Sequence, residues 1–382
     1  MKIGVPKEKR EREKRVALTP GLVEILISKG FEVLIEEDAG FESAFSNRYY
    51  RAAGATLIPT ASQLYSDSDV VLKINPPSPE EIGWMKKNAV LISFMFAATN
   101  PDFVLACCKQ GISTFSMDYI PRITRAQKMD ALSSQTNLAA YKAVILAADT
   151  IGKVFPLMMT AAGTIKPVKV VIFGAGVAGL QAAATARRLG AVVEVTDIRP
   201  ETKEQVESLG AKFIEVKGDD SLKTEGGYVK SVSEEFLKKQ KELVAKHVAD
   251  ADIVITTALV PGKKAPLLVS KEMVRSMRLG SVIVDMAAEQ GGNCELTEMN
   301  KIVLKEGVSI VGETNLASLL SLNSSQLYSK NITEFLFHLA TKEGFKWEME
   351  EEITKGSLIT HKGEVVHPVV LKAMEGKQTL AL

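Results

Sequence analysis

The chain has 382 residues, more than one hydrophobic core usually serves, so we expect two domains. Its 47 Lys and Arg residues balance 46 Asp and Glu residues, which argues against a general nucleic-acid-binding or membrane-surface protein. The three cysteines have no CxxC spacing, which indicates a reducing compartment, and no metal-ligand constellation is readable. No run approaches 18 apolar residues and the N-terminus does not resemble a signal peptide, so we expect a cytoplasmic protein without direct membrane insertion.

Short apolar runs alternate with helical patterns over the first 120 residues. The expected strands are 2–5, 31–36, 69–73, 89–95 and 112–117, and the expected helices include 20–29 and 102–109. This alternation predicts βαβ units and a parallel sheet. Since the runs are continuously apolar, we expect helices on both faces of that sheet.

A second series of strands begins after residues 161–167, a segment that we interpret as a hinge or entry loop. The expected strands are 168–173, 192–196, 253–256, 282–285 and 308–311. The remaining tail contains a predicted helix and a hairpin around His361-Lys362-Gly363 and is too small to be a domain. We therefore predict an α/β protein of two Rossmann-like domains, with parallel sheets flanked by helices and a cleft between them. The N-terminal domain is expected to be discontinuous (1–140 plus 320–382), and the NAD-binding Rossmann domain spans 160–315.

A glycine-rich loop follows the first strand of this second series. It reads Gly174-Ala175-Gly176-Val177-Ala178-Gly179, and a helical pattern begins directly after it. Glycines at this spacing permit a tight turn, a close backbone approach to a pyrophosphate and close packing of helix on strand. The amide groups at the start of the helix would then face the phosphates.

A carboxylate ends the next strand, 18 residues beyond the last glycine of the loop. This residue, Asp197, can accept hydrogen bonds from both hydroxyls of an adenosine ribose and would repel a 2′-phosphate. It therefore favours NAD over NADP. Arg199 weakens this preference, because an arginine there can serve a 2′-phosphate. The alternative is a tight strand–helix turn followed by a solvated Asp.

The chain resembles the NAD(H)-binding component, the alpha subunit or domain I, of proton-translocating nicotinamide nucleotide transhydrogenases. The resemblance covers nearly the whole chain, and its first stretch is shared with alanine dehydrogenases. The segments that carry it are Pro6-Lys7-Glu8, Arg15–Pro20, Arg122–Asp130 with Ser133-Ser134-Gln135, Met158–Thr164, the glycine loop, Thr256–Gly262 and Gly291–Cys294. The segment from Arg122 to Gln135 is the specific one.

The resemblance implies that Arg122, Gln127, Asp130 and Ser133 form the hydride-transfer site. In this family the corresponding loop holds the nicotinamide end of NAD(H) and faces NADP(H) on a partner domain. Two structural alternatives remain open. Thr124 and Gln127 have the spacing of a capping box, and Arg122 and Asp130 could form an ordinary ion pair.

The resemblance also places further nucleotide contacts, and it suggests a mobile lid at Gly226-Gly227-Tyr228 within residues 217–233. A surface loop with a packed tyrosine is the alternative for that segment. The expected cofactor-binding residues are Ile123, Thr124, Gly174, Gly176, Val177, Gly179, Asp197, Ile198, Arg199, Gly227, Tyr228, Gln240 and Leu259.

The rival function is that of an NAD-dependent, alanine dehydrogenase-like enzyme, which needs a proton-transfer group beside the hydride path. In alanine dehydrogenases a histidine supplies it, and Phe96 occupies that position here. All four histidines lie in the C-terminal half. Because phenylalanine cannot shuttle protons, the departure favours a transhydrogenase. A pure NAD-binding or regulatory module is the non-enzyme alternative.

The expected activity is Re/Si-specific NAD(P)+ transhydrogenation, with NADP(H) held on a partner domain. The resemblance further implies a homodimer and membrane subunits that couple hydride transfer to proton translocation. It places the chain at the inner face of the bacterial cell membrane as a peripheral protein.

Overall fold

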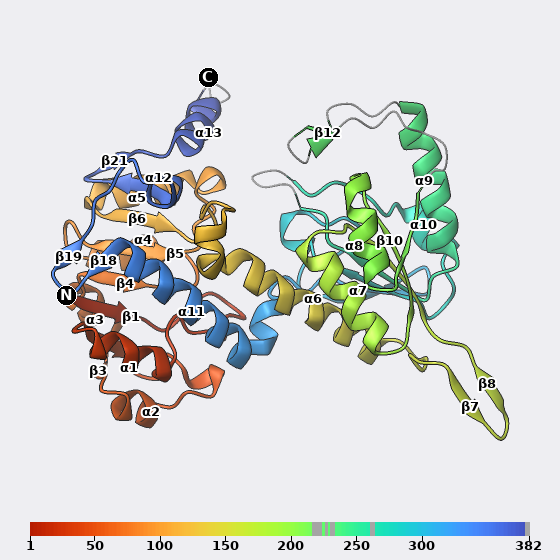
Figure 1. Ribbon diagram of the computed structural model, residues 1–382, viewed down its shortest axis with the longest axis horizontal. Helices are drawn as coiled ribbons and strands as arrows, with labels where there is room; N and C mark the ends of the chain where they lie inside the picture. The colour runs from red at the N-terminus through yellow and green to blue at the C-terminus, as the bar shows by residue number, and fades with distance from the viewer. Residues whose placement is uncertain (216–223, 226–227, 230–233, 260–263, 379–382) are drawn as a thin grey trace. The chain divides into compact units, whose positions relative to one another are not determined.

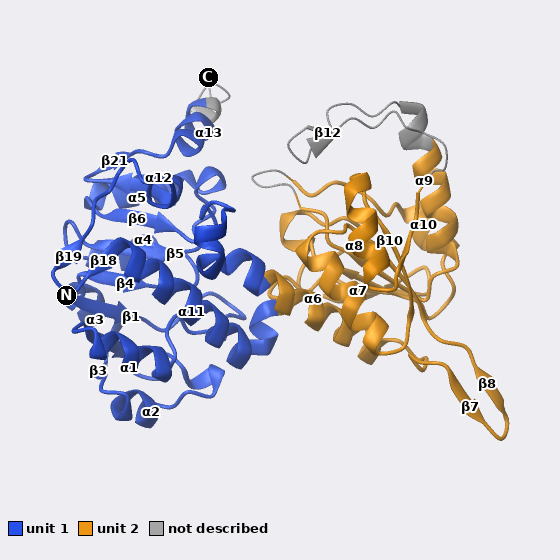
Figure 2. Cartoon of the chain, viewed as in Figure 1, with its two compact units in different colours: residues 1–135, 317–382 blue, residues 136–316 orange. Residues whose placement is uncertain are grey.

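The structure is a computed structural model that describes residues 1–215, 224–225, 228–229, 234–259 and 264–378. The chain divides into two compact units, coloured separately in Figure 2. Unit 1 contains residues 1–135 and 317–382, and unit 2 contains residues 136–316. The first boundary falls within helix α6 (Ala131–Thr150), directly after Gln135.

Unit 1 is built on an eight-stranded sheet in the order β21-β20-β6-β5-β4-β1-β2-β3. The strands from β3 to β6 are parallel and follow the 3-2-1-4-5-6 order of a Rossmann fold. The C-terminal strand β20 joins β6 antiparallel and forms a hairpin with β21. The strands are β1 (Lys2–Val5), β2 (Glu32–Glu36), β3 (Thr56–Ile58), β4 (Val70–Leu72), β5 (Val90–Ser93), β6 (Ser113–Ser116), β20 (Leu358–His361) and β21 (Glu364–Val365).

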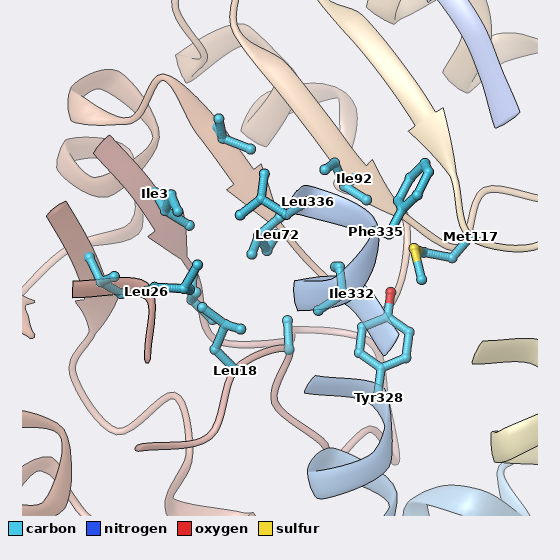
Figure 3. Close-up of a cluster of buried hydrophobic side chains, with 14 of the residues drawn as sticks. Ile3, Leu18, Leu26, Leu72, Ile92, Met117, Tyr328, Ile332, Phe335 and Leu336 are labelled. Atoms are coloured by element: carbon cyan, nitrogen blue, oxygen red, sulfur yellow. The ribbon is translucent and has the colours of Figure 1, made fainter. Parts of the chain in front are cut away.

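Helices cover both faces of this sheet, as Figure 1 shows. The long helix α11 packs on one face, where Leu72 and Ile92 meet Ile332 and Leu336 (Figure 3). Because successive strand residues face opposite sides, Leu91 packs with α4 and α5 on the other face. The helices are α1 (Pro20–Ser28), α2 (Asn47–Ala52), α3 (Ala61–Asp67), α4 (Pro79–Trp84), α5 (Pro101–Gln110), α11 (Ser321–Leu339), α12 (Glu352–Ser357) and α13 (Pro368–Gln378), with 3-10 helices η1 (Phe41–Ser43), η2 (Ala97–Thr99) and η3 (Thr124–Met129); a short hairpin pairs β18 (Ala340–Thr341) with β19 (Gly344–Phe345).

Unit 2 contains a seven-stranded sheet in the order β11-β10-β9-β14-β15-β17-β16. Its first six strands are parallel and repeat the 3-2-1-4-5-6 order, while β16 closes the edge antiparallel to β17. The strands are β9 (Lys169–Phe173), β10 (Val192–Thr196), β11 (Lys212–Phe213), β14 (Ile253–Thr256), β15 (Val282–Asp285), β16 (Ile302–Lys305) and β17 (Val308–Val311). Two Rossmann-like sheets flanked by helices confirm the predicted fold class.

The central strand β9 shows why this second sheet is covered on both sides. Val170 and Ile172 are buried with α6 and α7, whereas Val171 and Phe173 are buried with α9 and α10. The remaining elements of the unit are α7 (Val177–Arg188), α8 (Lys203–Ser208), α9 (Glu234–Ala249), α10 (Lys271–Ser276), η4 (Pro200–Thr202), η5 (Ala288–Gln290), η6 (Leu316–Leu320), and the hairpin strands β12 (Thr224–Glu225) and β13 (Tyr228–Val229).

The segment before the glycine-loop strand differs from its prediction. The sequence predicts a hinge or entry loop at residues 161–167, but strands β7 (Met158–Thr160) and β8 (Gly163–Ile165) form an antiparallel hairpin there. Figure 1 shows it projecting from its own unit. The interpretation as a hinge is wrong because residues on both sides of Ala161-Ala162 pair with one another. The hairpin predicted at His361-Lys362-Gly363 is present, with positive φ at Lys362 and Gly363.

Candidate functional site

The glycine loop lies between β9 and α7, and each of its three glycines has a separate structural reason. Gly174 has a φ of 101°, and a Cβ there would lie 2.5 Å from Thr257 Oγ1. A Cβ at Gly179 would lie 1.8 Å from the carbonyl oxygen of Gly174, so only glycine lets the helix pack this closely on the turn. A Cβ at Gly176 would meet nothing closer than Arg199 at 3.9 Å, which leaves this backbone open to an approaching group.

Helix α7 begins at Val177 with Gly176 as its N-cap, and no side chain caps it. The first amide groups of an uncapped helix lack intrahelical partners and carry the positive end of the helix dipole. An open backbone at Gly176 beside these amides can therefore accept a pyrophosphate.

Asp197, directly after β10, connects the loop with its neighbouring strand. Its Oδ2 accepts from the amide of Ala175 at 2.7 Å, and its carboxylate forms a two-point pair with the Arg199 guanidinium at 2.9 and 3.0 Å. Burial alone would raise the pKa of Asp197, but the hydrogen bonds from Arg199 and from the Ala175 amide lower it below its usual range. The residue is therefore a fixed anion at the position where the ribose of a dinucleotide is bound in Rossmann folds.

Two exposed apolar side chains flank this carboxylate at the same edge of the sheet. Ile198 follows β10 and is 55% exposed, and Leu259 follows β14 and is 49% exposed. The carboxyl ends of parallel strands meet at one edge, so both residues belong to the edge that carries the glycine loop.

Sequence reasoning missed two residues that hold the end of β14. Thr257 donates to the carbonyl of Phe173 at 2.9 Å, and the fully buried Asn293 accepts from the Ala258 amide at 3.1 Å and donates to its carbonyl at 2.9 Å. In the sequence, Gly291-Gly292-Asn293 stands out only by its family resemblance, although an amide side chain directly after two glycines was the available signal.

The remaining nucleotide-contact predictions lie in or near residues that are only partly described. Gly226 and Gly227 of the predicted lid lie outside the described residues. Tyr228 belongs to β13, which pairs with β12, and Gln240 lies half-buried on α9.

The segment predicted to transfer hydride lies in unit 1, and we call residues 122–133 the hydride-transfer loop. Arg122, Thr124 and Gln127 are exposed or half-buried, while Ile123 packs partly against the core. Within the described chain, the side chains of Arg122 and Gln127 have no hydrogen-bond or ion-pair partner. Both are therefore available to a ligand.

The two structural alternatives for this loop are wrong. Residues 124–129 form a 3-10 helix whose N-cap is Ile123, and no side chain caps it, so Thr124 and Gln127 do not form a capping box. Asp130 instead accepts from the Ser133 amide at 2.9 Å and from its hydroxyl at 2.6 Å. Its carboxylate therefore caps the start of α6 and is not paired with Arg122.

The backbone of the hydride-transfer loop is fixed by contacts within unit 1. Ala126 and Met129 are buried in the core that α11 completes. The Arg125 guanidinium lies 3.2 Å from Glu351 and 3.5 Å from Glu352, next to and within α12. Exposed polar side chains are thus presented from a rigidly anchored backbone.

A separate pocket of about 690 Å³ lies in unit 1 between the β4–α4 segment and α5. Phe96 lines it, is 46% exposed and has a φ of 47°, a left-handed conformation that the Asp118 carboxylate supports by accepting from the amides of Met95 and Phe96. The charged Glu8 and Lys73 in the wall are 3.5 Å apart and buried. Burial raises the pKa of Glu8, and Lys73 acts in the opposite direction.

The four histidines all have partners outside these sites. The polar partners of His247, His338, His361 and His367 are Glu194, Glu351, Ser113 and the Gly356 carbonyl, respectively. Among the described residues, no group of three or more His, Cys, Asp or Glu side chains could hold a metal ion. No helix in that same portion of the chain has the length and apolar character needed to cross a membrane.

Comparison with known proteins identifies the family. Residues 4–139 match the N-terminal domain, and residues 143–368 the C-terminal domain, described as "Alanine dehydrogenase/PNT". The chain belongs to the alanine dehydrogenase/PNT family. It therefore has the NAD-binding, Rossmann-like architecture and the oxidoreductase character that this family and its transhydrogenase relatives support.

Individual relatives place the chain on the transhydrogenase side of this family. It is 49% identical over 380 residues to the first portion of the NAD(P) transhydrogenase alpha subunit of Rhodospirillum rubrum, a separate protein there, covering 97% of this chain and 99% of that protein. Alanine dehydrogenase of Bacillus subtilis is 30% identical over 380 residues, covering 97% of this chain and 94% of that protein. A solved transhydrogenase structure from Sinorhizobium meliloti superposes with a TM-score of 0.88 at 46% identity, over 96% of this chain and all of that one.

Proposed function

We propose that this chain is the NAD(H)-binding component of a proton-translocating, Re/Si-specific transhydrogenase and presents its nucleotide for direct hydride transfer to NADP+ held on a partner domain. Membrane subunits would couple this transfer to proton translocation. The observation that carries the proposal is the hydride-transfer loop, where Arg122 and Gln127 are unpartnered within the described chain on an anchored backbone.

The glycine loop supports NAD(H) as the resident nucleotide. The open backbone at Gly176 and the uncapped start of α7 fit a pyrophosphate. The Asp197 carboxylate fits ribose hydroxyls and repels a 2′-phosphate, and the exposed Ile198 and Leu259 provide apolar surface for an adenine. When bound, the nicotinamide ring supplies or accepts the hydride.

The residues of the hydride-transfer loop would orient that ring. A guanidinium at Arg122, with Asp130 and Ser133, can hold a carboxamide and a ribose, while the exposed amide of Gln127 can reach towards the second nucleotide. Direct transfer between two nicotinamides requires mainly that the rings be fixed at close approach. It requires no acid–base group, which agrees with the structural partners of the four histidines.

Oxidation of an amino acid is the rival reaction, and Phe96 disfavours it. An apolar ring at the edge of the unit 1 pocket cannot take a proton from an amine. We therefore expect no alanine-dependent reduction of NAD, and measurable turnover with alanine would restore the dehydrogenase assignment.

We further propose a homodimer, located at the inner face of the cell membrane through its partner subunits. The β7–β8 hairpin and the residue before it carry four exposed apolar side chains, Leu157, Met158, Met159 and Ile165, and a two-stranded hairpin is marginal in water alone. A second copy of the chain would cover this surface. Met159→Asp should shift the sedimentation coefficient from dimer towards monomer, and an unchanged dimer would exclude this arm from the interface.

The decisive experiment mixes this protein with the NADP(H)-binding domain of a transhydrogenase and follows stopped-flow hydride transfer. Gln127→Asn should slow transfer on the order of a hundredfold while weakening NADH binding little, because the amide orients two rings rather than anchoring one nucleotide. Gln63→Asn, the same shortening at an exposed position of unit 1, is the control. Transfer at the unmodified rate would remove Gln127 from the mechanism, and no transfer by the unmodified protein would refute the proposed function.

A further inference from the structure

The hydride-transfer loop is held from outside by a buried asparagine of α11. Asn331 is 9% exposed, and its Nδ2 donates to the backbone carbonyl of Lys128 at 2.8 Å. Its Oδ1 accepts from the hydroxyl of Ser134 at 2.7 Å. The carbonyl of Lys128 can only accept, so the orientation of the amide is determined by the contact itself.

These two bonds fix the loop at the positions where its functional residues lie. Lys128 stands between Gln127 and Asp130 in the chain. Ser134 follows Ser133, whose amide and hydroxyl hold the Asp130 carboxylate. One side chain therefore ties the end of η3 to the first turn of α6, on either side of Asp130.

The helix that carries Asn331 is itself a rigid support. Neighbouring side chains of α11, Ile332 and Phe335, are fully buried against the unit 1 sheet. Next to Ser134, Gln135 donates to the Ser324 carbonyl at 3.0 Å and accepts from Arg15 at 2.8 Å. The position of Lys128 thus depends on a connected set of buried polar contacts and not on the local sequence of the loop.

We propose that Asn331 is a positioning residue for hydride transfer, which sets the place of Gln127 and Asp130 through the Lys128 carbonyl without touching a nucleotide. The inference rests on the proposed function. Transfer depends steeply on the separation and alignment of the reacting groups, so a small displacement of the loop should reduce the rate. NADH affinity should change little, since the glycine loop and Asp197 provide a separate set of contacts in unit 2.

Three variants separate the two bonds of Asn331. Asn331→Leu has a similar volume and removes both bonds, whereas Asn331→Asp keeps an acceptor for Ser134 and removes the donor to Lys128. Ser134→Ala removes only the other bond. Asn323→Leu is the matched control, because Asn323 is exposed on the same helix and donates only to Gln326.

Two measurements are made on the full chain: stopped-flow hydride transfer with the NADP(H)-binding domain, and NADH affinity from nucleotide fluorescence. Asn331→Leu and Asn331→Asp should both transfer about tenfold or more slowly, with NADH affinity within about threefold of the unmodified protein. Ser134→Ala should be affected less, and Asn323→Leu not at all. Transfer by Asn331→Asp at the unmodified rate, or a parallel loss of transfer and NADH affinity, would overturn the proposal.

Amide hydrogen exchange tests the positioning itself, without a partner domain. Residues 124–130 should exchange faster in Asn331→Leu than in the unmodified protein, while the β9–α7 segment should not change. Unchanged exchange in residues 124–130 would overturn the inference even if transfer were slow. If the unmodified protein exchanges normally but transfers no hydride, the proposed function fails and this inference fails with it.

Discussion

The glycine loop and the hydride-transfer loop are held in place in opposite ways. The glycine loop is fixed by contacts that are close in the chain, such as the approach of Gly179 to the Gly174 carbonyl and the bond from Ala175 to Asp197. The hydride-transfer loop is fixed by Asn331 and Glu351, which are 203 and 226 positions from their partners Lys128 and Arg125. Phosphate binding uses backbone amides, which a local motif can arrange, whereas orientation of a ring by side chains needs an external support.

The largest expected effect concerns the buried polar network beneath the hydride-transfer loop. Glu13 pairs with Arg15, which also donates to Gln135, and the pKa of Glu13 is lowered to about 2; burial acts to raise this pKa, but the charge and hydrogen bonds of Arg15 outweigh it. A carboxylate with a depressed pKa stabilises the fold above its unfolded pKa, and that contribution is lost as the pH falls from about 4.5 to about 2. Glu13→Gln should cost about 3 kcal/mol at pH 7, because it leaves Arg15 buried without its charged partner.

Urea unfolding followed by tryptophan fluorescence measures this effect, because both tryptophans, Trp84 and Trp347, lie in unit 1. The variant should also lose less stability than the unmodified protein between pH 4.5 and pH 2. Glu11→Gln makes the same charge change at an exposed position and should change neither quantity. Equal stability of the two variants would show that the network is not needed.

The next effect tests the local character of the glycine loop. Gly179→Ala places a methyl group 1.8 Å from the Gly174 carbonyl oxygen, so α7 must shift. We expect a loss of stability of about 2 kcal/mol and at least about a tenfold loss of NADH affinity. Gly176→Ala meets no close neighbour, so it should fold normally and lose affinity only. Thermal unfolding and NADH titration separate the two, and equal melting temperatures would contradict the packing argument.

A smaller effect concerns nucleotide choice at the same loop. Asp197→Ala should weaken NADH binding about tenfold, since it removes a charged hydrogen-bond acceptor, and should narrow the preference over NADPH. Arg199, released from its pair with Asp197, would then be available to a 2′-phosphate. Fluorescence titration of both nucleotides is the measurement, with the Asp197→Ala/Arg199→Ala double variant as the control. Equal affinities in the unmodified protein would remove Asp197 from the site.

The smallest effect is expected at the surface of the hydride-transfer loop. Arg125 is 63% exposed where it pairs with Glu351 and Glu352, so Arg125→Ala should cost only about 0.5 kcal/mol. Hydride transfer should slow far less than in Asn331→Leu. A larger loss of transfer in Arg125→Ala than in the asparagine variant would show that the surface pair, and not the buried amide, supports the loop.

The sequence by itself determined the two Rossmann sheets, the phosphate loop and the terminal carboxylate Asp197. Alternating apolar runs, glycine spacing and a strand end are local patterns, and covalent geometry gives each a small range of structures. The same local reasoning misplaced residues 161–167 as a hinge and offered a capping box for Thr124 and Gln127. Only the tertiary structure decided that Asp130 caps α6 and that Asn331 anchors Lys128. The asparagine joins segments far apart in the chain, and burial of α11 against the sheet, which no local pattern encodes, brings them together.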